Sequence, residues 1–563
     1  MLLAVAFTFI SFHIYNNTYW ELLNWVKERY PDIYHIDELG STYFSLSQYK
    51  FLRVYVLVIT ALCYTLVLLS FYYRNILYGI VLWVIIETRD LFVSIVNSYR
   101  FLERKQLCLV AGAFILILIH HTYFLTLMPF RVDDVFSYLF FVRNGPLVSA
   151  LHYPEPNNHI LFNILCSLLK VFSLSPLWTM KIPSLFYCLI ALFILFPFVK
   201  YFYGFATAFI CLVLSGFMHP SFIYAIQGRG YMLMSLFVLC AMCSIFLYLF
   251  HKKKGYYLFL FGLFGVLGAY TMPTFLLFYI PVIVYALIYL STNERKKLLL
   301  AVVVSGVITL MLYVPVIIIN GHDTVFNNRW VRSLEWWKFI DTLPSAIVDS
   351  INYLLALPSK GHYLVPLLLI SLLWIFKKGG SEKKWIQFFV LLLVFTGLFL
   401  FVTRRFPPYR VWTYLSFLTN ITLAILIVYY VRMFVKSFSI YSILITSLLV
   451  FAYTRVVLST DRFLPDKKYY KSLDVSVKHI LNSTQGDIYV DKDEFLYFYL
   501  LLENTKRDKI VSIDRVMQKE KQYDVLVLYN DIFPLTIGEN KYIRLFSFDG
   551  ASVFQYRKID ALQ

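Results

Sequence analysis

The chain consists mostly of long apolar runs separated by short polar or basic segments. A helix that crosses the hydrocarbon core of a bilayer needs about 20 mostly apolar residues. Runs of this kind lie at 52–72, 106–128, 182–200, 204–219, 231–250, 255–271, 273–291, 297–319, 362–377, 385–402, 412–431 and 437–458. A weaker run at 76–97 carries charged residues, and the short apolar opening segment lacks the basic leader and cleavage site of a signal peptide, which favours an anchor. The pattern therefore predicts an all-α polytopic membrane protein with about 13 transmembrane helices.

Lysine and arginine collect in the short segments between these runs, and such segments usually face the cytoplasm. The basic clusters are Arg104-Lys105, Lys252–Lys254, Arg295–Lys297, Lys377-Lys378 with Lys383-Lys384, and Arg432 with Lys436. They all fall on one side of the membrane if an even number of runs separates each neighbouring pair, which holds provided that 158–176 does not cross. We therefore expect the large loops 129–181 and 320–361, and everything after about residue 459, on the opposite, periplasmic side.

The last hundred or so residues change character. Helix-like and strand-like segments alternate there, and the final strand-like pair is joined through Asp549-Gly550, which is typical of a hairpin turn. We expect a small α/β extramembrane domain. The predicted organisation is therefore extra N-terminal membrane helices over 1–105, a membrane core over 106–459 and a periplasmic α/β domain over 460–563.

The composition excludes a soluble enzyme, a disordered chain and a small secreted domain held together by disulfides. Of the 563 residues, 60% are apolar and 15% are charged, whereas a soluble domain has about 45–50% and about 25%. The net charge of +18 is explained by cytoplasmic loops beside phosphate headgroups, so we expect no nucleic acid partner. All seven cysteines lie inside apolar runs, which indicates buried small side chains rather than a disulfide framework.

The strongest candidate chemistry begins where the run 106–128 ends. Two adjacent acids, Asp133 and Asp134, stand within a few residues of the expected outer interface, and Glu155, Asn158 and His159 follow before the next apolar stretch. Polar residues at the bilayer edge are costly unless they are paired or functional. The alternative interpretation is a helix start capped by one of the acids.

Several arginines are expected on the outer face, against the usual bias of positive charge toward the cytoplasm. Arg229 opens the run 231–250, Arg404, Arg405 and Arg410 surround the Pro407-Pro408 break, and the loop 320–361 adds Arg329 and Arg332. Arginine is well suited to hold a phosphate or diphosphate. Together with the acids, these residues suggest group transfer from a polyprenyl phosphate, in which the phosphate leaves against arginine and a carboxylate takes the proton of the attacking hydroxyl.

This pattern resembles the GT-C superfamily of polyprenyl-phosphate-sugar-dependent glycosyltransferases, most closely its protein O-mannosyltransferase and aminoarabinose (lipid A) transferase branch. The motifs that carry the resemblance are the acidic pair, HYPEPNNH before the next apolar segment, RGYML at Arg229–Leu233 and PPYRVWTYL at Pro407–Leu415. The resemblance covers roughly residues 106–430. The N-terminal region and the tail depart from it.

The resemblance implies a role for each matching residue. Asp133 is expected to be the general base, with Asp134 in a less defined catalytic role. The remaining substrate-binding residues are expected to be Glu155, Asn158, His159, Arg229, Tyr231, Arg404 and Arg410, with Arg229 and Arg410 on the donor phosphate. The implied reaction is an inverting sugar transfer in the bacterial inner membrane, from the lipid donor to a hydroxyl of a protein, lipid or glycan. No metal site and no cofactor are expected, although a divalent metal stays open.

Two other functions remain open at this point. A metal-dependent oligosaccharyltransferase is the close relative, but the sequence offers no convincing metal cluster. A polytopic transporter or flippase of lipid-linked glycans is the alternative from a different class. Transporters usually place polar groups within spans near the midplane, whereas here these groups concentrate in the expected external loops.

Overall fold

Most of the described chain is helical. The computed structural model describes residues 1–563 apart from 31–43, 129, 155–156, 173–174, 322–332, 356–369, 372–376, 378–381, 435–439, 492–493, 508, 519–520, 530–541, 549–550 and 557–563. The chain divides into two compact units. The first comprises Met1–Leu125 and Phe140–Val456, and the second comprises Thr126–Leu139 and Val457–Gln563.

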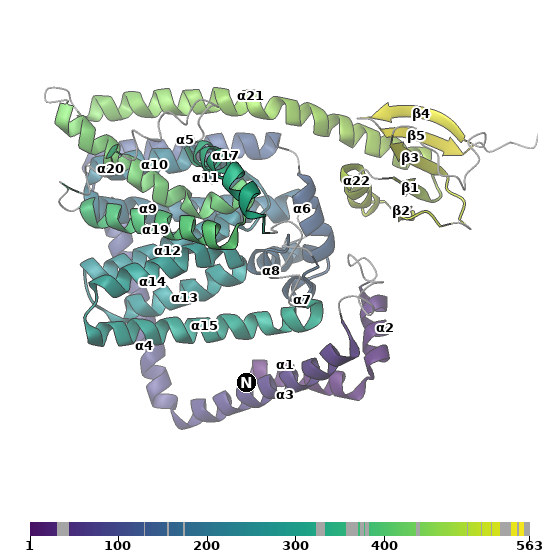
Figure 1. Ribbon diagram of the computed structural model, residues 1–563, viewed down its shortest axis with the longest axis horizontal. Helices are drawn as coiled ribbons and strands as arrows, with labels where there is room; N and C mark the ends of the chain where they lie inside the picture. The colour runs from purple at the N-terminus through teal and green to yellow at the C-terminus, as the bar shows by residue number, and fades with distance from the viewer. Residues whose placement is uncertain are drawn as a thin grey trace, which may run out of the picture. The chain divides into compact units, whose positions relative to one another are not determined.

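The first unit is a bundle of apolar helices, several of which run side by side (Figure 1). Its helices are α1 (Leu2–Asn16), α2 (Tyr19–Arg29), α3 (Leu46–Tyr72), α4 (Arg74–Arg100), α5 (Arg104–Leu127), α7 (Pro146–Leu151), α8 (Ile160–Leu169), α9 (Pro176–Tyr203), α10 (Phe205–Phe217), α11 (His219–Ile226), α12 (Tyr231–Phe250), α13 (Gly255–Thr271), α14 (Leu276–Tyr289), α15 (Thr292–Asn320), α17 (Trp336–Leu355), α19 (Glu382–Thr403), α20 (Ser416–Phe434) and the first part of α21 (Ile440–Ser483). Short 3-10 turns precede α14 and α20, at Pro273–Phe275 and Tyr409–Leu415.

Seven helical segments in the described part of the chain are long and apolar enough to cross a membrane. They are α3, α5, α9, α12, α15, α19 and Tyr409–Met433. The bent pair α10 and α11 makes an eighth if it counts as one span, and four further helical segments are apolar but shorter. The predicted all-α polytopic membrane architecture with a small C-terminal domain is confirmed. Of the predicted runs, 362–377 lies almost entirely outside the described residues.

Local sequence explains several helix boundaries. Ser45 and Ser291 cap α3 and α15 through capping boxes with Gln48 and Glu294. Gly204 separates α9 from α10 with φ of 84°, a conformation that glycine adopts without strain. Between α10 and α11 the axis bends by 52°, where Pro220 cannot continue the preceding ladder of hydrogen bonds. The predicted run 204–219 therefore belongs to a broken helical segment.

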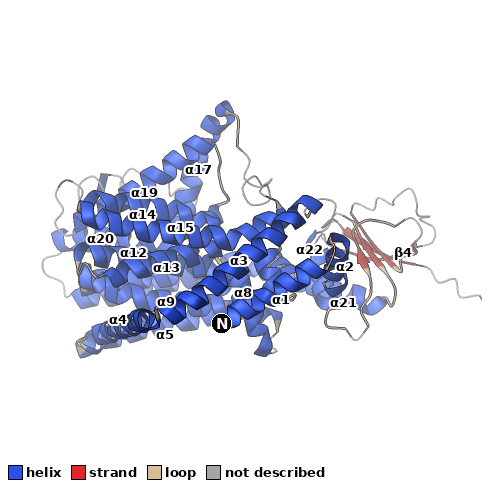
Figure 2. Ribbon diagram, turned by 90° about the horizontal axis from the view of Figure 1, so that it is seen from below, coloured by secondary structure: helices blue, strands red, loops and turns tan. Residues whose placement is uncertain are grey.

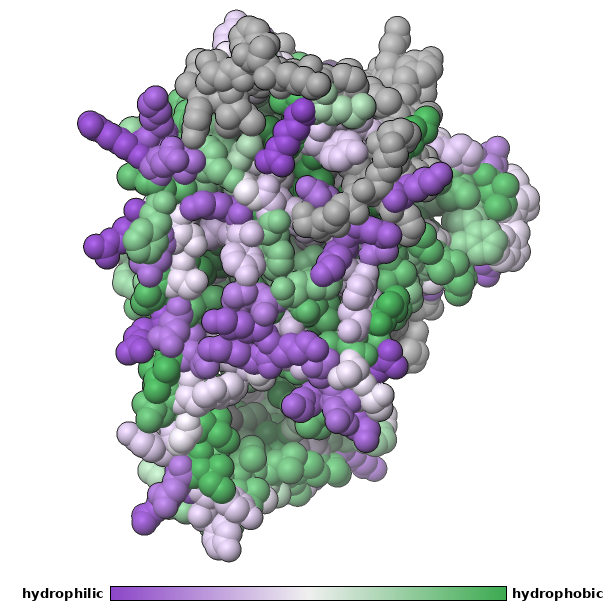
Figure 3. Space-filling view, turned by 90° about the vertical axis from the view of Figure 1, so that its left-hand side faces the viewer, coloured by the Kyte–Doolittle hydropathy of each residue, from purple (hydrophilic) through white to green (hydrophobic). Residues whose placement is uncertain are grey.

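Helix α4, which corresponds to the weak run 76–97, is not among the candidate spans. It lies crosswise to the bundle helices at one end of the first unit (Figures 1 and 2). Its Glu87 pairs with Lys254 at 2.7 Å, its Thr88 contacts the Tyr256 hydroxyl at 2.8 Å, and Lys200 of α9 donates to the Ser98 carbonyl. Hydrophilic residues form a band across this end of the molecule (Figure 3). The charges of α4 are thus held at the polar end of the bundle.

The second unit contains a five-stranded sheet with strand order β2-β1-β3-β5-β4. Its strands are β1 (Ile488–Val490), β2 (Ile513–Asp514), β3 (Val525–Tyr529), β4 (Tyr542–Phe548) and β5 (Ala551–Tyr556). Strand β1 pairs in parallel with β2 and β3, and β5 pairs antiparallel with β3 and β4. Helix α22 (Glu494–Asn504) connects β1 to β2, and helix α6 (Val132–Ser137) belongs to the same unit although it lies far away in sequence.

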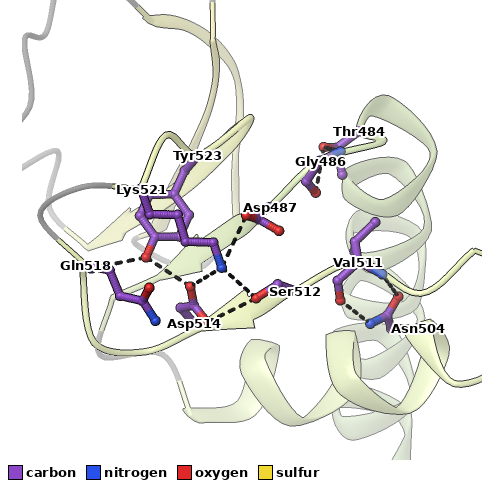
Figure 4. A network of polar contacts seen from close by, with 10 residues as sticks. All are labelled: Thr484, Gly486, Asp487, Asn504, Val511, Ser512, Asp514, Gln518, Lys521 and Tyr523. Atoms are coloured by element: carbon purple, nitrogen blue, oxygen red, sulfur yellow. Dashed lines mark hydrogen bonds and ion pairs between the residues drawn. The ribbon is translucent and has the colours of Figure 1, made fainter.

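A polar network stabilises the parallel half of this sheet (Figure 4). The Lys521 ammonium lies 2.8 Å from an Asp514 oxygen and 3.2 Å from an Asp487 oxygen. The Tyr523 hydroxyl donates to Asp514 at 2.9 Å. The carboxylates at this end of the sheet are therefore neutralised by the domain's own lysine.

Candidate functional site

The acidic pair forms the first turn of α6. The Arg131 backbone N–H donates to an Asp134 carboxylate oxygen at 3.3 Å, so Asp134 satisfies one of the backbone donors that a helix start leaves open. Asp134 is buried, whereas Asp133 is only partly buried. The two neighbouring acids therefore have different environments, and of the two only Asp133 is partly exposed to solvent.

His159 and the loop before α12 form the centre of a polar cluster in the first unit. His159 precedes α8, and its Nδ1 accepts the Gly230 N–H at 2.8 Å. Its ring also makes an edge contact with Tyr231, with centroids 4.8 Å apart. The Arg229 guanidinium lies 5.8 Å from the centroid of the same tyrosine ring. The structure thus brings together three residues that the sequence singled out in two separate segments.

The electrostatics of this cluster define the protonation of His159. Burial lowers the pKa of His159 well below its ordinary value, and the positive charges of Arg229 and Arg410 lower it further. The imidazole is therefore neutral near pH 7. Because Nδ1 accepts a hydrogen bond, the ring hydrogen is on Nε2. His159 is thus a neutral hydrogen-bond donor on which the charges of two arginines act, and one of them, Arg229, is only 3% exposed.

Asn158 ties the loop before His159 to its surroundings. Its amide donates to the backbone carbonyls of Ser149 and His152 at 2.9 and 2.7 Å. Its oxygen accepts from the Asn163 amide at 2.9 Å. Both hydrogens of the Asn158 amide are engaged with the backbone, so the contacts of this side chain hold the position of the loop.

A chain of aromatic and hydroxyl contacts extends from Tyr231 toward Arg410. The Tyr231 ring lies 4.5 Å from that of Tyr224, and Tyr224 shares a hydrogen bond with Tyr353. The Tyr353 hydroxyl is 3.1 Å from the Thr413 hydroxyl, which donates to the Arg410 carbonyl at 2.7 Å. This series of contacts joins the RGYML and PPYRVWTYL motifs through Tyr224 and Tyr353. The sequence did not single out these two tyrosines, because aromatic residues are abundant throughout the protein.

The other predicted site residues lie elsewhere or cannot be placed. The guanidinium of Arg404 is 5.3 Å from the centroid of a Trp336 ring, and Arg404 has a positive φ of 51°. None of the contacts that the structure gives for Arg404 reaches His159 or Arg229. Glu155 lies outside the described residues.

Lys181 is a buried charged residue that the hydrophobic pattern did not single out. It lies near the start of α9, is fully buried, and its ammonium donates to the Leu125 carbonyl at 3.3 Å. Lys181 directly precedes the predicted run 182–200 and lies within α9 (Pro176–Tyr203) in the structure. A charge so close to an apolar run is a sequence signal in its own right, because a charged residue within a membrane helix is costly and usually functional. Among the described residues, no group of three or more His, Cys, Asp or Glu side chains could hold a metal ion.

The contact between Gly230 and His159 leads to a stability test. Gly230 has an ordinary φ of −69°, but an added Cβ would lie 2.7 Å from the His159 Cβ. We expect Gly230→Ala to lower the free energy of unfolding by about 1–3 kcal/mol, as overpacking usually does, measured by thermal unfolding in detergent. The matched control is Gly306→Ala in α15, where nothing lies within 4 Å of the added carbon. Equal stability of the two variants would contradict the close packing of this loop on His159.

The long apolar helices, the buried histidine–arginine cluster and the small α/β domain define a multi-pass membrane protein of GT-C-like fold. Two solved structures that share the fold are those of ArnT from Cupriavidus metallidurans, in the apo state and bound to undecaprenyl phosphate. The apo structure is 12% identical with a TM-score of 0.55, and the bound one is 13% identical with a TM-score of 0.54. Each match covers 80% of this chain and 97% of ArnT. The GT-C-like fold implied by the sequence motifs is thereby confirmed.

A third match is more distant. The archaeal oligosaccharyltransferase AglB from Archaeoglobus fulgidus, in complex with an inhibitory peptide and a dolichol-phosphate, is 10% identical with a TM-score of 0.40. That match covers 72% of this chain and 64% of AglB. No protein-family model and no curated protein matches the chain.

Proposed function

We propose that the protein transfers a sugar from a polyprenyl-phosphate-linked donor to a hydroxyl group of a protein, lipid or glycan on the periplasmic face of the inner membrane. The observation that carries the proposal is the pair of arginines whose charges act on the buried, neutral His159. Arginine side chains are well suited to hold a phosphate group at a membrane, because the planar guanidinium can donate two parallel hydrogen bonds to its oxygens. The similarity of the fold to ArnT, one structure of which holds undecaprenyl phosphate, supports the same choice of donor.

In the proposed reaction the acceptor oxygen attacks the anomeric carbon of the sugar. The bond from this carbon to the phosphate oxygen breaks, and the polyprenyl phosphate leaves with the electron pair. Arg229 and Arg410 stabilise the negative charge that develops on the phosphate, and the Nε2–H of His159 donates a hydrogen bond to the donor. Asp133 receives the proton of the acceptor hydroxyl. A single displacement of this kind inverts the configuration at the anomeric carbon.

The two acids of α6 have distinct roles in this proposal. Asp134 holds the start of the helix through the Arg131 N–H, which leaves Asp133 as the base. Asn158 positions His159 through the backbone contacts of its amide. Arg404 and Glu155 stay substrate-binding predictions from the sequence, as does Tyr231, whose ring contacts both His159 and Arg229.

The proposal is tested by reconstituting the purified protein into vesicles that contain a polyprenyl-phosphate sugar and a soluble or lipid hydroxyl acceptor. We expect release of polyprenyl phosphate in step with the appearance of glycosylated acceptor. Movement of intact donor between leaflets without release of polyprenyl phosphate would contradict sugar transfer and identify a flippase instead.

The orientation of the chain gives an independent test. The basic clusters assign the tail to the periplasm, so alkaline phosphatase fused after residue 563 is expected to be active in intact bacteria. The same enzyme inserted in the turn 252–254 serves as the cytoplasmic control and is expected to be inactive. Activity of the second fusion and inactivity of the first would overturn the proposed topology.

A further inference from the structure

The acidic turn and the C-terminal tail form one compact unit. Thr126–Leu139 belongs with Val457–Gln563, although more than 300 residues separate the two segments. Within this unit α6, which carries both acids, packs on α22 of the α/β domain. The segment with the proposed base is therefore supported by the part of the chain that departs most from the family pattern.

Phe498 of α22 makes the contact. The ring of Phe498 meets that of Phe136 edge to face, with centroids 5.5 Å apart, and both side chains are buried. A buried aromatic pair therefore anchors the acidic turn on α22.

The position of α22 is itself fixed by the sheet. Leu496 and Leu500 of this helix are fully buried, and the Asn504 side chain at its end forms two hydrogen bonds with the backbone of Val511, at 2.7 and 3.1 Å. On the other side, the Tyr470 ring of α21 lies 5.8 Å from that of Tyr499. The helix on which α6 packs is thus held in place by several contacts.

We propose that the C-terminal domain positions the acidic turn, with Phe498 anchoring α6 through Phe136 and acting, through the helix, as a positioning residue for Asp133. The kinetic part of this inference rests on the proposed function, because it assumes that Asp133 is the base. The structural part does not. A side chain that holds a catalytic group needs support from packing and from polar neighbours, since misplacement by about 1 Å can cost about 100-fold in rate.

The structural part is tested by hydrogen exchange on the full-length protein in detergent. In Phe498→Ala we expect the amides of residues 130–139 to exchange at least about tenfold faster than in the wild type, because α6 loses its packing partner. The matched control is Phe495→Ala on the same helix, where the side chain is 46% exposed and exchange in 130–139 is expected to stay unchanged. Phe498→Leu, which keeps an apolar side chain, is expected to restore most of the protection. Unchanged exchange in Phe498→Ala would overturn the inference.

The kinetic part is tested with Phe498→Ala. We expect kcat to fall about tenfold while KM for the donor stays within about twofold, since the change affects the base and not donor binding. Phe495→Ala is again the control and is expected to match the wild type, and Phe498→Leu is expected to restore most of kcat. Equal kcat for Phe498→Ala and the wild type would remove Phe498 from the positioning role.

The two parts separate the inference from the proposed function. Protection of 130–139 that depends on Phe498, in a wild-type protein without transferase activity, would support the structural inference and contradict the proposed function. An active wild type in which Phe498→Ala matches Phe495→Ala in both hydrogen exchange and kcat would contradict the inference alone.

Discussion

Replacing Asp133 by asparagine is expected to lower the rate of sugar transfer by about 100- to 10,000-fold, the range that general base catalysis usually supplies. Asparagine keeps the size of the side chain but cannot take the proton of the acceptor hydroxyl. Asp133 is the partly exposed member of the pair, and Asp134 accepts the N–H of Arg131. Donor binding is therefore expected to remain close to that of the wild type. The measurement is single-turnover transfer in vesicles with saturating donor.

The control for this variant is Asp474→Asn in α21. Asp474 forms an exposed i,i+4 ion pair with Lys478 at 2.7 Å, and such a pair contributes little to stability. Asp474→Asn is expected to transfer sugar at the wild-type rate. Full activity of Asp133→Asn under the same conditions would exclude this carboxylate as the base.

Replacing Arg410 by alanine is expected to weaken binding of the donor by about 10- to 100-fold, which corresponds to the loss of one or two hydrogen bonds to a charged group. Arg410 is an exposed residue, and its charge acts on His159 together with that of Arg229. Binding of a hydroxyl acceptor without phosphate is expected to change much less. Titration of a fluorescent polyprenyl phosphate into the detergent-solubilised protein measures the first quantity.

Arg405→Ala in the same loop is the matched control. The Arg405 side chain donates to the Ser333 hydroxyl at 3.1 Å, and none of its described contacts reaches His159. We expect its donor affinity to equal that of the wild type. If Arg410→Ala and Arg405→Ala bind the donor equally well, Arg410 does not hold the phosphate.

The long helices could be predicted from the hydrophobic pattern because a helix that crosses a membrane must itself consist of about 20 mostly apolar residues in succession. The run 231–250 coincides with α12 (Tyr231–Phe250). The pattern was less informative for α4, because a crosswise helix with an apolar stretch has the same local composition as a span. Only the ion pair of Glu87 with Lys254 and the contacts near it, which are long-range, distinguish the two cases.

The candidate site could be predicted only in part. The polar residues in otherwise apolar surroundings identified His159 and Arg229, but their contact through Gly230 spans 71 positions of sequence. The role of Asn158 as a backbone tie, and the linking tyrosines Tyr224 and Tyr353, depend on partners that no local pattern specifies. The packing of the acidic turn on α22 is the extreme case, because more than 300 residues of sequence separate the two segments.

The central claim is that the protein binds a polyprenyl phosphate through its arginines, and mass spectrometry of the lipids that co-purify with it tests this most directly. The experiment compares the wild type with Asp133→Asn after mild detergent extraction. We expect a polyprenyl phosphate or its glycosylated form in both samples, with the glycosylated form enriched in the variant because transfer is blocked. Bulk phospholipid alone in both samples, at a sensitivity that recovers added polyprenyl phosphate, would contradict the account.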